Sequence, residues 1–114
     1  DILNDAGFFT REAACAEEAL DSLHEPAFAD EIAALVTDVD MPGDLDGVGL
    51  AALVQECWPR MGVVVTSGAH RGAALLLRKP AVFLPKPFRA DRLIAALRSV
   101  IAPQFALAEQ RFAS

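Results

Sequence analysis

The sequence predicts an α/β domain with a doubly wound parallel sheet, in which helices connect successive strands. Two observations lead to this prediction. Short apolar segments alternate with segments of helical periodicity, and the inner apolar segments are continuous rather than alternating with polar residues. Continuous apolar runs are typical of parallel strands, because crossover helices cover both faces of such a sheet. The length of 114 residues suits one compact core, so a single domain is expected.

Four strands are predicted from the short apolar segments. They cover Gly7 to Glu12, Ile32 to Thr37, Gly62 to Thr66 and Ala81 to Leu84. The segment from Asp1 to Asp5 reads as the end of a helix, because the chain then enters the first of these strands. The connections between the strands are long enough for crossover helices and too long for hairpins.

Four helices are predicted where apolar residues recur at intervals of three and four. They cover Ala16 to Leu23, Val48 to Trp58, Arg71 to Leu77 and Ala90 to Ile101. Pro103 ends the last helix, because proline has no backbone amide hydrogen. We therefore expect a domain at residues 1–102 and a short C-terminal tail at residues 103–114.

The composition excludes several classes of protein. Hydrophobic residues make up 54% of the chain and charged residues 23%, which predicts a well-filled core. The net charge of −6 disfavours direct binding of nucleic acid. No apolar run approaches the ~18 residues of a membrane helix, and no signal peptide is recognisable, so a cytoplasmic location without membrane contact is predicted.

The cysteines and histidines form no recognisable metal or disulfide pattern. Cys15 and Cys57 lie outside any CxxC or Cys/His cluster and are interpreted as small core or helix residues. His24 and His70 are interpreted as solvent-exposed loop residues. Trp58 precedes a proline and is expected to pack at the end of its helix.

Three polar residues of different chemistry follow three of the predicted strands. Asp38 follows the strand at 32–37, Thr66 ends the strand at 62–66, and Lys86 comes shortly after Leu84. The carboxyl ends of parallel strands meet at one edge, where ligands bind in open α/β sheets. An acid, a hydroxyl group and an ammonium group are therefore expected to converge there.

At these residues the sequence resembles the receiver domains of two-component response regulators, a CheY-like superfamily. The resemblance extends from Asp1 to Ile101 and implies a flavodoxin-like (βα)5 receiver fold. The motifs that carry it are Thr37-Asp38-Val39-Asp40-Met41-Pro42-Gly43 with Asp46-Gly47, then Thr66-Ser67-Gly68, then Lys86-Pro87-Phe88.

The resemblance implies a phosphoryl acceptor rather than an enzyme that turns over a substrate. Asp38 would take a phosphoryl group from a histidine kinase or phosphotransfer protein, with Thr66 and Lys86 assisting catalysis. Thr66 and Phe83 would act as a switch that alters binding to a downstream protein target. Mg²⁺ would be held by Asp38 and the backbone carbonyl of Asp40. The family also implies a cis Lys86–Pro87 peptide bond, and it leaves a homodimer possible.

The family pattern is incomplete in this chain. Receiver domains begin with a buried strand that ends in an acidic pair holding Mg²⁺, and this chain contains neither. We expect that the native protein has about 15 to 20 further residues upstream, from average element lengths. That strand is central in the family's 2-1-3-4-5 order, so its absence predicts two exposed strand edges and the loss of most metal ligands.

Two other functions fit parts of the sequence. Asp38-Val39-Asp40 is a DxD motif after an apolar strand, as in haloacid-dehalogenase-like phosphatases, although no acid pair follows Lys86 to complete a metal site. A pseudo-receiver that binds a partner without being phosphorylated is the third interpretation. Within the receiver interpretation, both a free-standing regulator and the receiver piece of a hybrid kinase fit the sequence.

Overall fold

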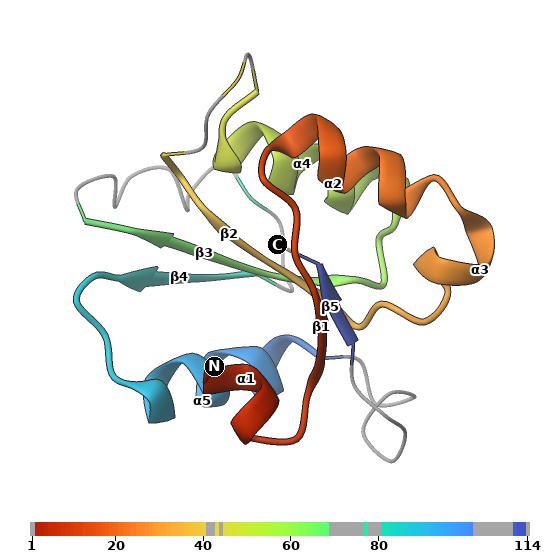
Figure 1. Ribbon diagram of the computed structural model, residues 1–114. Coiled ribbons are helices and arrows are strands. Elements are labelled where there is room, and N and C mark those ends of the chain that lie inside the picture. The colour runs from red at the N-terminus through yellow and green to blue at the C-terminus, as the bar shows by residue number, and fades with distance from the viewer. Residues whose placement is uncertain are drawn as a thin grey trace.

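The chain forms an α/β sandwich with one parallel sheet between two layers of helices (Figure 1). The computed structural model describes residues 2–40, 43, 45–68, 77, 81–101 and 111–113. The strands are β1 (Phe9–Arg11), β2 (Ala34–Asp38), β3 (Gly62–Ser67), β4 (Ala81–Pro85) and β5 (Arg111–Ala113). The helices are α1 (Ile2–Asp5), α2 (Ala16–Leu23), α3 (Pro26–Ala29), α4 (Gly47–Cys57) and α5 (Ala90–Val100).

Most of the predicted elements are present with small changes at their ends. The predicted helix at 16–23 matches α2, and β1 to β4 each overlap a predicted strand. The predicted helix at 71–77 lies outside the described residues except for Leu77. The short helix α3 was not predicted, because four residues carry no periodicity. Its one sequence signal is Pro26 in the first turn, where proline is favoured.

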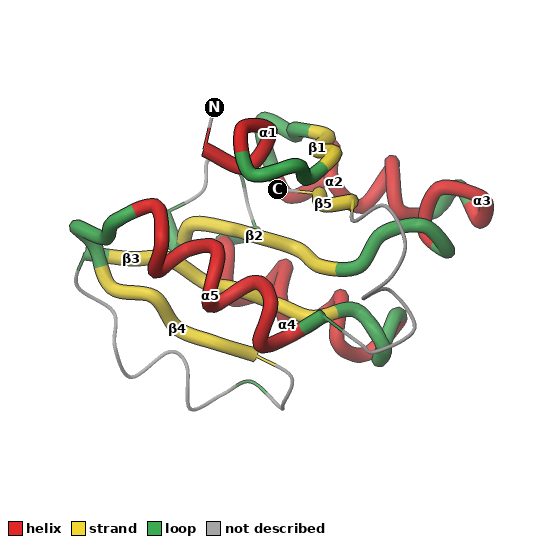
Figure 2. The backbone as a smooth tube through the Cα atoms, turned by 90° about the horizontal axis from the view of Figure 1, so that it is seen from below, coloured by secondary structure: helices red, strands yellow, loops and turns green. Residues whose placement is uncertain are grey.

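The sheet has five parallel strands in the order β1-β5-β2-β3-β4. β3 lies between β2 and β4, with Asp38 beside Thr66 on one side and Pro85 beside Ser67 on the other. Figure 2 shows α5 crossing one face of this sheet while α4 lies on the opposite face. The register brings the carboxyl ends of β2, β3 and β4 to one edge of the sheet, as the sequence predicted.

The strand β5 occupies the position between β1 and β2. Phe112 pairs with Thr10 of β1 and with Ala34 of β2, and Ala113 pairs with Arg11 and Leu35. The expectation of two exposed strand edges at this position is therefore wrong. The segment assigned to a tail contributes a strand to the sheet, because its backbone can supply partners to the amide and carbonyl groups of both neighbours. The domain boundary at residue 102 remains a prediction.

The core lies on both faces of the sheet. Alternate residues of β3 point to opposite faces, so Val63 and Val65 pack towards α2 and α4 while Val64 packs towards α5. Leu50 and Val54 of α4 are fully buried against the first face, and Leu97 of α5 is fully buried against the second. The strands that carry the polar edge residues are thus fixed by packing on both sides.

Within the described ranges, no helix has the length and apolar character needed to cross a membrane, since the longest two, α4 and α5, have 11 residues each. Both cysteines are free thiols. Cys15 is half-buried at the start of α2, and Cys57 is exposed at the end of α4. His24 is exposed after α2, and its ring lies 5.5 Å from that of Trp58, which packs at the end of α4 as expected. His70 lies outside the described residues.

The position of β5 generates a prediction about stability. Replacing Phe112 with proline removes one amide donor from the middle of β5, and proline is excluded from central strands for this reason. We expect Phe112→Pro to lower the free energy of unfolding by about 1–3 kcal/mol, the cost of an unpaired backbone group. Urea denaturation measures this change, and amide exchange should accelerate at Thr10 and Leu35.

Phe112→Val is the matched control, because valine keeps the backbone donor and favours strands. Equal stability and equal exchange in the proline and valine variants would show that β5 does not hold β1 and β2 together.

Candidate functional site

Asp38, Thr66 and Lys86 lie at the same edge of the sheet. Asp38 is the last residue of β2 and stands beside Thr66 of β3 in the ladder. Lys86 directly follows β4, and its backbone N–H donates to the carbonyl oxygen of Ser67 at 2.9 Å. This bond extends the pairing of β3 and β4 by one residue, so the start of the lysine side chain is fixed relative to the end of β3.

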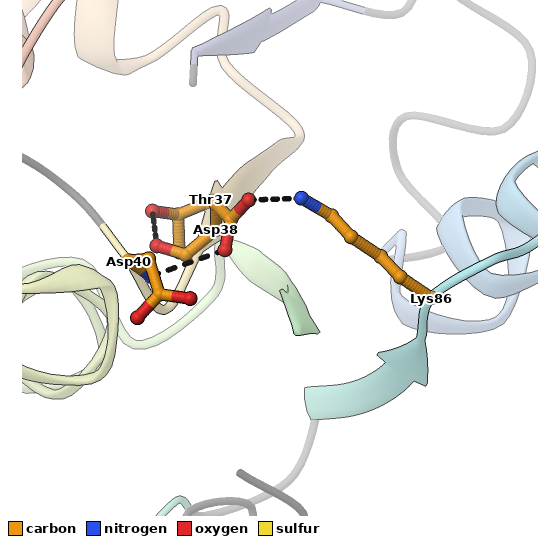
Figure 3. Close-up of polar contacts among 4 residues, drawn as sticks. All are labelled: Thr37, Asp38, Asp40 and Lys86. Carbon is orange, nitrogen blue, oxygen red and sulfur yellow. Dashed lines mark hydrogen bonds and ion pairs between the residues drawn. The ribbon is translucent and has the colours of Figure 1, made fainter. Parts of the chain in front are cut away.

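The ammonium group of Lys86 reaches across the end of β3 to the carboxylate of Asp38. Its Nζ donates a hydrogen bond to Oδ2 of Asp38 and forms an ion pair with it (Figure 3). The predicted contact between these two residues is confirmed. The lysine side chain is 46% exposed and the aspartate side chain 33%, so the carboxylate is open to an approaching reactant. The Lys86–Pro87 peptide bond is cis, as the resemblance implied.

The second carboxylate oxygen is held by the backbone. The N–H of Asp40 donates to Oδ1 of Asp38 at 3.1 Å, as Figure 3 shows. The hydroxyl group of Thr37 donates to the carbonyl oxygen of Asp38 at 3.2 Å, and the N–H of Val39 donates to the carbonyl oxygen of Thr66 at 2.9 Å. Both oxygens of the side chain and the backbone on both sides of it therefore have defined positions. The contribution of Thr37 was not predicted; its position directly before the acid is the only signal in the sequence.

These contacts determine the protonation of Asp38. Burial raises its pKa, but the hydrogen bond from Lys86, the hydrogen bond from the Asp40 amide and the charge of Lys86 together outweigh burial. The pKa of Asp38 consequently lies below its ordinary value of 3.8. At neutral pH the group is a carboxylate, the form that can act as a nucleophile.

The connection after Asp38 is anchored to the start of α4. The N–H of Gly47 donates to the carbonyl oxygen of Val39 at 3.1 Å, and the carboxylate of Asp46 accepts from the N–H of Gly49 at 2.8 Å. Asp46 is therefore the N-cap of α4, a role that suits aspartate. The end of β2 and the first turn of α4 form one connected unit.

The remaining predicted residues lie beside this site. Thr66 and Ser67 are buried at the end of β3. Phe83 pairs with Val65 in the ladder and is half-buried against the core cluster under α2 and α4. The hydroxyl role of Thr66 and the switch role of Phe83 remain predictions.

The residues present supply few ligands for a metal ion. Asp38 offers a carboxylate and Asp40 a backbone carbonyl, whereas Mg²⁺ requires six ligands in octahedral geometry. Among the described residues, no group of three or more acidic, histidine or cysteine side chains could hold a metal ion. The described residues thus do not form a complete magnesium site by themselves.

Comparison with known proteins places these observations in a family. No family model matches the chain. The chain is 30% identical over 101 residues to a putative NtrX-like response regulator of Rickettsia bellii, a match that covers 85% of this chain and 20% of the relative. The chain thus spans about a fifth of the length of the curated relatives it matches.

Solved structures of receiver domains are also similar to this chain, and the matches cover most of both chains. The receiver domain of NtrX from Brucella abortus is 35% identical with a TM-score of 0.72, and the match covers 87% of this chain and 83% of that one. A receiver domain protein from Clostridium thermocellum is 25% identical with a TM-score of 0.79, covering 94% and 85% of the two chains. The fold, the residues at the edge of the sheet and these similarities together show that the chain belongs to the CheY-like receiver domains of response regulators.

Proposed function

We propose that this receiver domain accepts a phosphoryl group on Asp38 and that phosphorylation alters its binding to a downstream protein. The observation that carries the proposal is the contact of Lys86 with Asp38 at an open edge of the sheet. Membership of a two-component family implies a histidine kinase as partner, and receiver domains are generally not turnover enzymes. A phosphotransfer protein as donor, a homodimer and a cytoplasmic location remain predictions.

The proposed reaction is a transfer from a phosphohistidine to the carboxylate. One oxygen of Asp38 forms a bond to phosphorus while the nitrogen–phosphorus bond breaks, and the imidazole nitrogen leaves with that electron pair. The products are an aspartyl phosphate and a free histidine. Such a transfer needs donors and positive charge around the equatorial oxygens of phosphorus. Lys86 supplies the charge, and the amide of Asp40 is a further donor beside the carboxylate.

The proposed switch begins with the hydroxyl group of Thr66. Thr66 pairs with Asp38 in the ladder, so a phosphoryl oxygen on Asp38 would lie near the threonine side chain. Hydrogen bonding to that oxygen would draw the end of β3 towards the phosphate and change the packing around Phe83. The place of Phe83 supports this proposal, because it is half-buried and pairs with Val65 of β3, so a movement at the end of β3 would change its packing.

Mg²⁺ belongs to the proposal only through the family, whose members typically bind it. Asp38 and the carbonyl of Asp40 would contribute to such a site, but the described residues leave it incomplete. The phosphatase alternative is not supported, because the proteins that this chain resembles are response regulators. The pseudo-receiver, which would bind a partner without phosphorylation, remains the outcome to exclude by experiment.

The proposed acceptor predicts a covalent product. When the protein at its natural length is incubated with acetyl phosphate and Mg²⁺, intact-mass analysis should show one added phosphoryl group per chain. The product should be stable in acid and labile in base, as expected for an acyl phosphate. Asp38→Asn should abolish labelling, because an amide is not a nucleophile at this position.

Asp40→Asn is the matched control, since Asp40 contacts the acceptor through its backbone amide and should keep labelling. Undiminished labelling of Asp38→Asn would remove Asp38 from its role. A wild-type protein that takes up no phosphoryl group would favour the pseudo-receiver.

The ion pair predicts a pH effect. Lys86→Met removes the hydrogen bond and the charge that lower the pKa of Asp38 but leaves the burial that raises it. We therefore expect the pKa of Asp38 in this variant to rise above its wild-type value, measured by carboxyl ¹³C chemical shift. A lowered pKa stabilises the folded state above the unfolded pKa, and this contribution is lost as pH falls through the folded pKa. The variant should therefore lose less stability on acidification.

Arg89→Met is the control cation, because Arg89 is highly exposed and pairs with Asp91 rather than with Asp38. If both variants left the titration of Asp38 unchanged, the contact with Lys86 would not govern the charge of the acceptor.

A further inference from the structure

The first residue of α4, Gly47, lies directly against the backbone of Asp38. A Cβ atom built on Gly47 would lie 1.8 Å from the carbonyl oxygen of Asp38 and 2.6 Å from its carbonyl carbon. It would also lie 3.0 Å from the hydroxyl oxygen of Thr37. Real Cβ atoms essentially never approach other heavy atoms to less than 3.0 Å. The absence of a side chain at Gly47 is therefore what allows α4 to begin here.

The atoms that crowd this position cannot move independently. Asp38 is held in the ladder beside Thr66, and its carbonyl oxygen accepts from the Thr37 hydroxyl. Gly47 itself is held by its hydrogen bond to Val39, and Asp46 caps the same turn of the helix. Any side chain at residue 47 must therefore displace either the end of β2 or the first turn of α4.

A second glycine in the same turn provides a contrast. A Cβ atom on Gly49 would meet Cδ1 of Leu45 at 2.5 Å and Cγ at 3.3 Å, and no backbone atom is among its nearest neighbours. The far end of a leucine side chain can rotate away from such a contact. The two glycines thus differ in what an added methyl group would move.

We propose that Gly47 is a positioning residue for phosphoryl transfer, because its missing side chain sets where the backbone of Asp38 lies. The position of that backbone determines where the carboxylate meets Lys86. This inference rests on the proposed role of Asp38 as phosphoryl acceptor.

The test compares Gly47→Ala with Gly49→Ala in the protein at its natural length. Both changes add one methyl group to the first turn of α4, and both favour the helix by the usual gain of alanine over glycine. Asp38 labelling is followed by intact mass over a range of acetyl phosphate concentrations. In Gly47→Ala the maximal rate should fall about 100-fold, the typical effect of a reacting group misplaced by about 1 Å. The half-saturating donor concentration should stay within about twofold. Gly49→Ala should label like the wild type.

Circular dichroism and the urea midpoint show whether each variant is folded. If Gly47→Ala does not fold, Asp46→Ala serves instead, because it removes the cap of α4 without adding a clash. Its maximal rate should fall at least threefold with the fold retained. A folded Gly47→Ala with the wild-type rate, or an Asp46→Ala with the wild-type rate when Gly47→Ala is unfolded, overturns the inference. Absence of labelling in the wild type would instead contradict the proposed function.

Discussion

The structure depends on the register of β3 between β2 and β4. The aspartate ends β2 and the lysine follows β4, the two strands that flank β3, so they meet only because the register aligns the ends of all three strands. The backbone hydrogen bond from Lys86 to Ser67 fixes the register of β3 against β4, and the hydrogen bond from Val39 to Thr66 fixes it against β2. A slip of one residue in either ladder would move a side chain to the opposite face of the sheet and separate the charges.

The ion pair itself contributes little to stability, because both partners are partly exposed and water screens their attraction. Its importance lies in preorganisation. The strand between the two charged residues, β3, is buried along its whole length, and Ala34 and Leu35 of β2 are fully buried, so packing fixes the backbone behind the ion pair. The carboxylate of Asp38 is therefore held by rigid neighbours yet remains partly exposed, and a fully buried pair would lack that access.

The sequence predicted where the three polar residues meet better than it predicted the sheet. Asp38, Thr66 and Lys86 could be identified because each follows an apolar run, and parallel strands align such positions. The role of β5 could not be predicted, because Arg111–Ala113 is too short to show a period and its pairing joins residues about a hundred positions apart. Gly47 entered the sequence analysis only as part of a motif. Its close approach to the backbone of Asp38 could not be predicted, because a glycine has no side chain whose chemistry would indicate such a contact.

The start of α4 also limits which groups could neutralise the phosphoryl group proposed for Asp38. A helix N-terminus offers free amide donors and a partial positive charge to anions. Here the N–H of Gly47 is already bonded to Val39, that of Gly49 is bonded to Asp46, and the Asp46 carboxylate adds negative charge to the same turn. The hydrogen bonds that cap α4 and join it to β2 therefore leave fewer free amide donors in its first turn to bind an anion. Among the described residues, Lys86 at the end of β4 is the cation that contacts Asp38, so in the proposed phosphorylated form this lysine would supply positive charge that the start of α4 offers only in part.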